Sequence, residues 1–463
     1  MQVSHTPAAV SASFDDPNLV STAGLVPIMR LAQNAGLAAL SQQWLSVPTD
    51  KGANAGAKVS SLVAGMVAGA DSIDDLAVLR HGAMGKLFNR IYAPSTLGSF
   101  LRAFTFGHVR QLDAVASRLL QGLAVQAPLL IPGGKDYTFL DVDDTIIKVH
   151  GHAKQGSGYG YSGVRGLNAI LATASTNTSA PVILGQRLRR GATGSPRGAK
   201  RLIRDALATL RRLHGMDQAP VLVRADSAFY GHATIATAIR AGADVSITAR
   251  MDPAVKKAVA SIDENAWTGI EYPEAIYDET TDRWISKAEV AEVPFTAFTS
   301  RKKSERVPGR LVVRRIPELN KKDLDQPGLF DLHRFHAFFT TSTLDTVTAD
   351  KTHRGHAVIE QVNADLKNSA LAHPPSGVFT ANAAWLVLAV LAFNLTRAAA
   401  TITGTGLAKA TTATIRRKIV SIPARIASSA RRLTLHLPRS WPWQQQWTAL
   451  FNHAHGPPTT TMT

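Results

Sequence analysis

Three carboxylates stand close together in the stretch Tyr137–Lys148. The stretch reads as an apolar, β-branched strand that turns acidic at Asp141, Asp143 and Asp144. Because side chains alternate along a strand, Asp141 and Asp143 are predicted on one face and Asp144 on the other. Crowded carboxylates repel one another and lose hydration, so a bound divalent cation is the usual reason for them. On this stretch alone, a solvated strand end without a cation is the alternative.

The same strand permits a second chemistry. An apolar strand followed by D-x-D-x-T is also the nucleophile motif of haloacid-dehalogenase-like phosphatases. In such an enzyme Asp141 would accept the phosphoryl group and Asp143 would be the acid/base. A phosphatase of that kind also needs a later GD-x3–4-D pair to hold magnesium, and none follows a suitable predicted strand. The phosphatase therefore ranks second.

Two later acids also follow or lie on predicted elements. Asp226 ends the apolar strand 219–225, and Glu360 lies on a predicted helix that also carries Lys367. Taken singly, Asp226 reads as a helix N-cap and Glu360 as a surface acid. Taken together, acids follow the first strand and the fourth strand and occupy a late helix.

Two further motifs carry weaker signals. His150 and His152 have metal-ligand spacing, but no Cys or third His is nearby, so a surface hairpin is favoured. The segment Gly158–Gly163 matches G-x-G-x-x-G, yet no helix opens there and no acid follows about 20 residues later. A glycine-rich hairpin tip is the favoured interpretation.

The elements that must position these residues fall into five regions. Residues 1–132 are predicted to be helical (segments 25–45, 59–70, 73–80 and 96–123), as a helix-turn-helix DNA-binding module or a plain helical bundle. Residues 133–266 read β-β-β-α-β-α-β, the order of an RNase H-like core. Residues 267–332 read as a β-rich insertion, with strands near 269–276, 290–298 and 310–316. Residues 333–397 complete the core with a strand and two helices, and 398–463 form a basic region with a disordered end after a Trp cluster. The predicted fold class is α/β, with a mixed sheet.

Composition narrows the setting and the substrate. The chain of 463 residues has no cysteine, no evident signal peptide, and an apolar run (383–393) too short to span a bilayer, so a cytoplasmic protein without membrane contact is predicted. The net charge is +17 and is unevenly placed. Residues 1–130 carry 9 Lys/Arg and 7 Asp/Glu, residues 146–225 carry 13 and 2, and residues 397–463 carry 9 and none. Basic blocks beside carboxylates favour a polyanionic substrate met at a metal site.

Three segments carry a family resemblance when read in order. Asp141–Thr145, Arg224–Phe229 and His353–Lys367 resemble the motif regions of bacterial insertion-sequence DDE transposases, especially the group numbered 1380. The resemblance covers roughly residues 15–400. It implies an RNase H-like enzyme that binds terminal inverted repeats and target DNA as a dimer and moves DNA by cut-and-paste transposition. A phosphatase, or an inactive DNA-binding relative, is the alternative.

The resemblance also implies roles for individual residues. Asp143, Asp226 and Glu360 would be the catalytic acids and would bind Mg²⁺, with Mn²⁺ as a substitute and Asp141 as the fallback ligand. Related transposases often have Tyr and Arg seven and four residues before the Glu. Here those positions hold His353 and His356, and Arg354 is the candidate replacement. The residues predicted to contact DNA are Arg187, Arg189, Arg190, Arg197, Lys200, Arg201, Arg354, His356 and Lys367.

Overall fold

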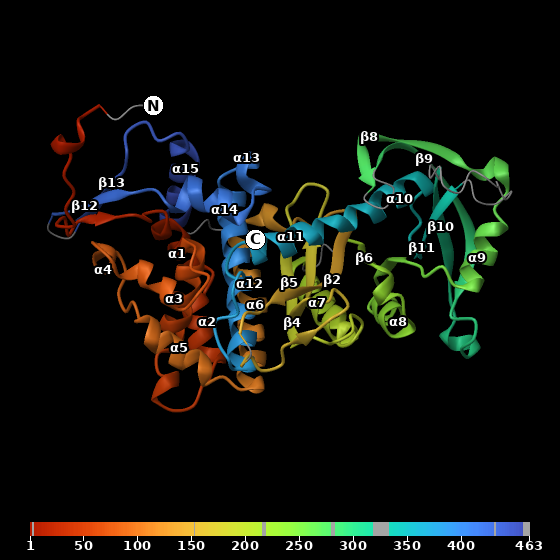
Figure 1. Ribbon diagram of the computed structural model, residues 1–463, viewed down its shortest axis with the longest axis horizontal. Helices are drawn as coiled ribbons and strands as arrows, with labels where there is room; N and C mark the ends of the chain where they lie inside the picture. The colour runs from red at the N-terminus through yellow and green to blue at the C-terminus, as the bar shows by residue number, and fades with distance from the viewer. Residues whose placement is uncertain are drawn as a thin grey trace.

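The computed structural model describes residues 1, 4–151, 153–214, 219–278, 283–317, 333–429 and 432–456. The molecule is elongated, with helices from the first 130 residues at one end and strands β8 to β10 at the other (Figure 1). Those strands belong to a mixed sheet that continues toward the N-terminal helices, so the predicted α/β class is confirmed. The candidate metal ligand His152 lies outside the described residues.

The N-terminal helices are shorter than the sequence pattern predicts. The predicted helix 25–45 is two helices, α1 (Leu25–Asn34) and α2 (Leu37–Trp44), because Gly36 adopts the left-handed region at φ 91° between them. The predicted helix 96–123 is also divided, into α5 (Pro94–Arg102) and α6 (Phe106–Gln126). Thr105 opens α6 with a capping box shared with His108. The other described helical elements here are α3 (Ala55–Ala68), α4 (Met84–Leu87) and the 3-10 turn η3 (Asp74–Arg80).

One helix joins this module to the sheet. Among the described residues, α12 (Phe379–Ile402) is the helix long and apolar enough to cross a membrane, but most of it is buried inside the protein. It packs against α3, α5, α6 and strand β5 (Figure 1). Its Asn394 accepts a hydrogen bond from the Ile183 amide at 2.9 Å and donates one to the Ile183 carbonyl at 2.8 Å. A polar residue within the apolar helix thus ties it to β5.

The first half of the sheet has the predicted order of elements. Strands β2, β4 and β5 are followed by helix α7, strand β6, helix α8 and strand β7, with a two-residue strand β3 after β2. In space the order is β5-β4-β2-β6-β7. Neighbours among the first three strands are antiparallel, whereas β6 and β7 run parallel to β2. The bounds are β2 Thr138–Lys148, β3 Gly158–Tyr159, β4 Arg165–Ser175, β5 Val182–Arg190, α7 Ala199–His214, β6 Val221–Ala225, α8 His232–Arg240 and β7 Asp244–Thr248.

The β-rich insertion extends this sheet. Strand β11 (His333–Thr340) pairs with β7, and β10 (Val307–Pro317) pairs with β11 and with β9 (Arg283–Ala297), which pairs with β8 (Thr268–Asp278). Helix α9 (Pro253–Ala260) precedes these strands. The three predicted strands correspond to β8, β9 and β10, and the insertion is held to the core by continuous backbone hydrogen bonds. Part of it, residues 279–282 and 318–332, lies outside the described residues.

The C-terminal region folds back onto the N-terminal helices. Strand β12 (Ala424–Ser429) pairs with β13 (Arg432–His436) and with β1 (Leu19–Val20), and α15 (Gln444–His455) packs on α1. The prediction of a disordered end after the Trp cluster is wrong as far as residue 456, because Trp447, Leu450 and Ala454 are buried there. Residues 457–463 lie outside the described part. The short helices of this region are α13 (Thr405–Ala408), α14 (Thr412–Ile415) and the π-helical turn η10 (Arg416–Val420).

Candidate active site

Strand register brings two of the predicted acids together. In the parallel β2–β6 pair, Asp141 lies opposite Arg224 and Val142 opposite Ala225. One residue further along, Asp143 and Asp226 therefore come side by side where β6 ends. Both line one pocket, of ≈ 490 Å³. Asp226 also caps the next turn, because its Oδ1 accepts the Ala228 amide at 3.0 Å, so its N-cap role coexists with its place in the site.

The electrostatics of Asp143 and Asp226 favour a bound proton or cation. The pKa of Asp143 is raised to about 6, chiefly by burial; the charges of Asp226 and Asp144 add to the rise, and a backbone hydrogen bond and His356 oppose it. Burial likewise raises the pKa of Asp226, with a further contribution from the charge of Asp144. Two carboxylates held together against this desolvation have an affinity for protons or for a hard cation.

The helix that carries Glu360 lies along β2. Helix α10 (Thr346–Arg354) ends in a 3-10 turn, η9 (Gly355–Ala357), and α11 (Val358–Lys367) follows. Three hydrogen bonds join the turn and α11 to β2, and their partners follow one another in the same direction along both elements. His356 Nδ1 bonds Asp141 Oδ1 at 2.9 Å, Asn363 Nδ2 donates to Asp143 Oδ2 at 2.9 Å, and Lys367 Nζ donates to Thr145 Oγ1 at 3.0 Å. Residues seven apart on a helix differ by about 20° in direction, so Glu360 shares the strand-facing edge with Lys367. Because Glu360 falls between His356 and Asn363, it lies between the levels of Asp141 and Asp143 along β2.

The three predicted acids, Asp143, Asp226 and Glu360, do not converge on a single metal-binding position in this structure. Glu360 is exposed and does not belong to the lining of the pocket that contains Asp143 and Asp226. Within the part of the chain that the structure describes, no group of three or more His, Cys, Asp or Glu side chains could hold a metal ion. The structure thus brings two acids together and leaves the third on the adjoining helix.

Asp141, the fallback ligand, is already fully engaged. Its side chain has no exposed surface, and Arg224 binds both of its oxygens, from Nε and Nη2 at 2.8 Å each. His356 takes up Oδ1 as well. Arg224 also donates from Nη1 to the Thr352 carbonyl at 2.6 Å, and a Cβ at Gly355 would lie only 2.7 Å from that nitrogen. Asp141 therefore anchors the turn before α11, and its geometry does not suit metal binding.

His353, at the position where related enzymes often have Tyr, is half-buried and also has internal partners. Its two ring nitrogens bond the hydroxyls of Ser246 at 2.9 Å and Thr248 at 3.1 Å, and its ring stacks on Phe338 with centroids 4.0 Å apart. The pKa of His353 is lowered to about 3, chiefly by burial and also by the positive charges of nearby residues. His353 is consequently a neutral packing residue that fixes α10 on β7 and β11.

Asp144 takes partners different from those of Asp143, as strand alternation predicts. Arg189 Nη2 approaches Asp144 Oδ2 at 2.6 Å, and Asn168 donates to the same oxygen at 2.5 Å. The Arg189 side chain is 9% exposed and also donates to Asn168 Oδ1 and to three backbone carbonyls. The Arg189 guanidinium thus neutralises a buried acid inside the protein, which leaves little of its side chain free for the predicted contact with DNA.

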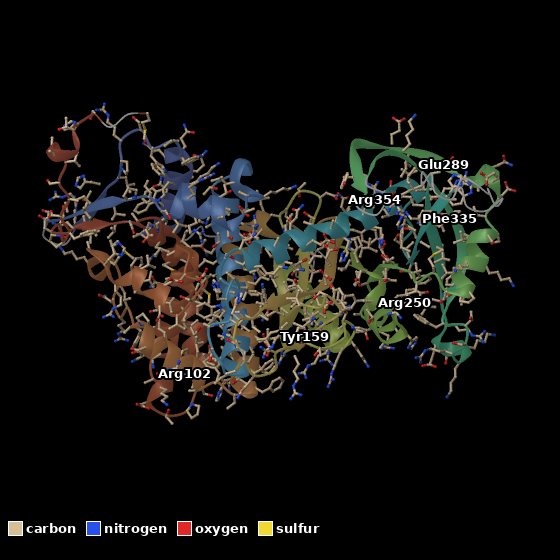
Figure 2. All side chains as sticks on the ribbon, in the orientation of Figure 1. Arg102, Tyr159, Arg250, Glu289, Phe335 and Arg354 are labelled. Atoms are coloured by element: carbon tan, nitrogen blue, oxygen red, sulfur yellow. The ribbon has the colours of Figure 1, made fainter. Side chains whose placement is uncertain are left out.

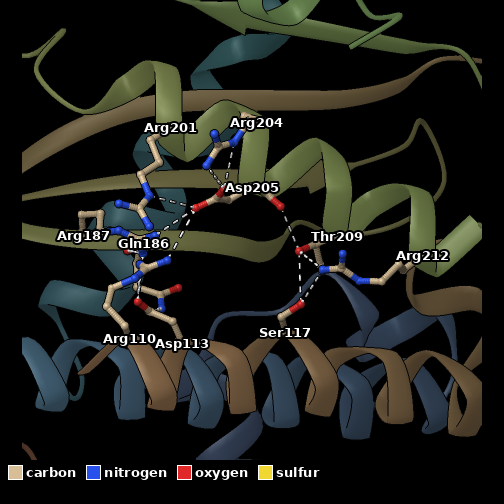
Figure 3. A network of polar contacts seen from close by, with 10 residues as sticks. All are labelled: Arg110, Asp113, Ser117, Gln186, Arg187, Arg201, Arg204, Asp205, Thr209 and Arg212. Atoms are coloured by element: carbon tan, nitrogen blue, oxygen red, sulfur yellow. Dashed lines mark hydrogen bonds and ion pairs between the residues drawn. The ribbon is translucent and has the colours of Figure 1, made fainter. Parts of the chain in front are cut away.

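Arg187 is committed to a second internal network (Figure 3). It pairs with Asp113 of α6 at 3.1 Å and with Asp205 of α7 at 3.4 Å. These pairs hold α6, β5 and α7 together and leave 22% of the Arg187 side chain exposed, so its contact with DNA stays a prediction. Arg201 reaches the same Asp205 at 3.7 Å but keeps 62% of its side chain exposed.

The remaining predicted DNA-contacting residues differ in their surroundings. Arg354, labelled in Figure 2 on α10, pairs with Asp350 at 2.8 Å and is partly exposed. The residues with exposed side chains are Arg190, Arg197, Lys200 and Lys367.

Two functional candidates emerge that the sequence reasoning did not single out. Asn363 supports Asp143 from α11, and Arg224 supports Asp141 from β6. Arg224 stands two residues before Asp226 within a recognised motif, but its partner lies 83 residues away. Asn363 lies one helical turn after Glu360, so its place on the same face of α11 was the available signal.

The carboxylates at adjoining strands of a mixed sheet, with a third acid on the helix alongside, place the protein among transposases of the DDE class. Residues 3–455 match the family described as transposase DDE domain group 1. The chain belongs to that family, and the predicted resemblance to DDE transposases is confirmed. No curated protein matches the chain. Its biological process is accordingly DNA transposition, a form of recombination, and enzymes of this class generally use divalent metal ions.

Proposed function

We propose that this protein is an RNase H-like DDE transposase that binds the terminal inverted repeats of its element and catalyses metal-dependent DNA cleavage and strand transfer. The observation that carries the proposal is the pair Asp143 and Asp226, held side by side with raised pKa values beneath the helix of Glu360. The family assignment supplies the reaction class.

The strand order supports the RNase H-like part of the proposal. Numbered along the chain, β5-β4-β2-β6-β7 is 3-2-1-4-5, with three antiparallel strands followed by two parallel to the first. In this layout residues 133–266 and 333–397 form the catalytic core, 267–332 the insertion, and 1–132 the module that reads the terminal repeat. Residues 398–463 contribute a basic surface, and their β12 and α15 belong structurally with the first module.

The donor set fits a hard divalent cation. Asp143 and Asp226 offer carboxylate oxygens in the lining of one pocket. These are the ligand types that Mg²⁺ prefers, with Mn²⁺ as a substitute. Bound there, such ions supply activation of water and then of a 3′-hydroxyl, and stabilise the leaving oxygen of an in-line displacement.

The protein's own residues set the geometry around that cation. Asn363 holds one oxygen of Asp143 at 2.9 Å, which orients the carboxylate toward the pocket. Arg224 and Asp141 fix the turn from which α11 departs, and Glu360 completes the ligand set by reaching across from α11. The hydrogen bonds of His356 and Lys367 to β2 hold both ends of this segment beside the strand that carries Asp143.

Exposed cations near the pocket are suited to phosphates. The pocket is lined by Ala192–Ser195, in the loop between β5 and α7, and Arg190 and Arg197 flank this loop with exposed side chains. Lys200 follows on the first turn of α7. Such contacts give affinity that falls with salt and depends little on sequence. A dimer that bridges two element ends, acting in the cytoplasm on nucleoid DNA, completes the proposal.

The phosphatase alternative is disfavoured by one observation. Its nucleophile would be Asp141, whose side chain is fully buried and bound at both oxygens by Arg224. A carboxylate in that state has no open path to an incoming phosphate ester.

The test compares Glu360→Gln with Glu271→Gln, which changes an exposed glutamate of β8. The substrate is DNA that carries the inverted repeats flanking the gene, with Mg²⁺ or Mn²⁺. We expect Glu360→Gln to lose cleavage and keep DNA binding, and Glu271→Gln to keep both. Full cleavage by Glu360→Gln would remove Glu360 from the site. Binding without cleavage by the wild type, in either metal, would instead support an inactive DNA-binding relative.

A further inference from the structure

Two tyrosines stand at the rim of the acid pocket. Tyr159 and Tyr161 line the same pocket as Asp143 and Asp226, and their side chains are 68% and 86% exposed. Single exposed aromatic residues are ordinary on protein surfaces. Tyr159 and Tyr161 are separated by a single glycine and border a pair of carboxylates. Together they form a local apolar surface within a polar site. Figure 2 labels Tyr159.

The hairpin that carries the tyrosines is fixed in place. Strand β3 pairs Gly158 and Tyr159 with Gly166 and Arg165 of β4. The hairpin is also closed by three further hydrogen bonds: Gly191 amide to Gly156 carbonyl at 2.9 Å, Gly163 amide to Gly160 carbonyl at 3.1 Å, and Arg165 Nη2 to Ser157 Oγ at 3.1 Å. A Cβ at Gly191 would collide with the backbone of Gly158 and Gly166. The glycines thus let the hairpin lie flat against the ends of β4 and β5, which presents the rings on a firm support.

The negative charges of the pocket acids act on Tyr161. Partial burial raises the pKa of Tyr161, and the negative charges of Asp144, Asp143 and Asp226 raise it further. Across the pocket lie Thr193 and Ser195 of the loop that leads to the exposed cations of α7.

This combination fits one class of ligand. Aromatic faces beside a cationic surface bind single-stranded nucleic acid, because each unpaired base can stack on a ring while its phosphates meet the cations. A base inside a duplex is already stacked on its neighbours and cannot reach such a ring unless it leaves the helix. The occupant is therefore a nucleotide that is unpaired at, or next to, the phosphate held by the acids.

We propose that Tyr159 and Tyr161 form a stacking platform for an unpaired nucleobase of the DNA strand whose phosphate is positioned at Asp143 and Asp226. The inference rests on the proposed function, because it takes DNA as the substrate of this pocket. It predicts that the enzyme prefers DNA whose end is frayed or single-stranded at the cleavage position over a fully paired end.

The probe is a terminal-repeat duplex with a three-nucleotide single-stranded tail containing 2-aminopurine, compared with the blunt duplex. The variants are Tyr159→Ala and Tyr161→Ala, with Tyr161→Phe to keep the ring. Phe106→Ala is the matched control, since Phe106 is also 68% exposed but begins α6, outside the pocket lining.

We expect the wild type to bind the tailed duplex more tightly than the blunt one and to quench 2-aminopurine fluorescence. Each Tyr→Ala variant should lose about five-fold or more of its affinity for the tailed duplex, with blunt-duplex binding unchanged. Tyr161→Phe and Phe106→Ala should behave as the wild type. Unchanged affinity and quenching in both Tyr→Ala variants would overturn the platform while leaving the transposase intact. A wild type that binds and cleaves neither DNA would overturn the proposed function, and the platform with it.

Discussion

Removing the charge of Asp143 should stabilise the metal-free protein while it abolishes the activity. The side chain is largely buried, and its pKa is raised from 3.8 to about 6. A raised carboxyl pKa means that the folded state binds the proton more tightly than the unfolded state. The charge therefore does not lower the free energy of unfolding at low pH. It lowers this free energy increasingly as pH rises from about 4, and the effect levels off above about 6.

The size of the effect follows from that shift. One pKa unit corresponds to about 1.4 kcal/mol, so the charge destabilises the fold by about 3 kcal/mol at pH 8 and by roughly half of that at pH 5. Asp143→Asn removes this cost and keeps an oxygen that can accept the hydrogen bond from Asn363. Relative to the wild type, the variant should gain more stability at pH 8 than at pH 5. Because a bound cation stabilises only the folded wild type, added Mg²⁺ should narrow the difference at pH 8.

Urea unfolding at pH 5 and pH 8, with and without Mg²⁺, measures these differences, with Glu271→Gln as the exposed control. An Asp143→Asn protein that is less stable than the wild type at pH 8, or whose gain is equal at both pH values, would refute the reasoning. An unchanged gain in the presence of Mg²⁺ would refute the assignment of the cation to this carboxylate.

Three further predictions concern the residues around the site. Asn363→Ala should slow single-turnover cleavage about ten-fold with DNA binding unchanged, because it removes one outer-sphere hydrogen bond that orients Asp143. Equal cleavage rates in the variant and the wild type would contradict this role of Asn363. Arg224→Met should lower the free energy of unfolding by about 3–5 kcal/mol, because it leaves Asp141 buried without its partner; chemical denaturation that shows a loss below 1 kcal/mol would count against the pair. Lys200→Ala should weaken binding to all DNA sequences alike and reduce the salt dependence of binding by about one unit of slope, as fluorescence anisotropy in a salt series would show. A sequence-specific loss would show that Lys200 contacts bases.

The sequence predicts those features of the site that depend on residues close to one another along the chain. Strand alternation predicted different partners for Asp143 and Asp144, although Asp144 also lines the pocket, and the apolar run before Asp226 predicted that this acid ends a strand. Helical spacing placed Glu360 and Lys367 on one face of α11. Each of these inferences needs only the local period of a strand or a helix.

The sequence did not reveal contacts between distant segments. Arg187 and Arg189 read as part of a basic block, but Asp113 lies 74 residues before Arg187, and Asp144 lies 45 residues before Arg189. Local charge counts cannot reveal such pairs, because they depend on how α6, β2 and β5 meet. The apolar residues of α15 were likewise hidden in a basic, Thr/Ala-rich segment, and only the packing on α1 shows their use.

The central claim is that Asp226 contacts the catalytic metal ion together with Asp143 and Glu360. Since the chain contains no cysteine, Asp226→Cys introduces a unique thiolate, a soft ligand that accepts Mn²⁺ more readily than Mg²⁺. Single-turnover cleavage of terminal-repeat DNA is measured for this variant in each metal. The account predicts no cleavage in Mg²⁺ and a clear recovery in Mn²⁺. Wild-type cleavage in Mg²⁺, or an equal absence of cleavage in both metals, would contradict direct contact between Asp226 and the ion.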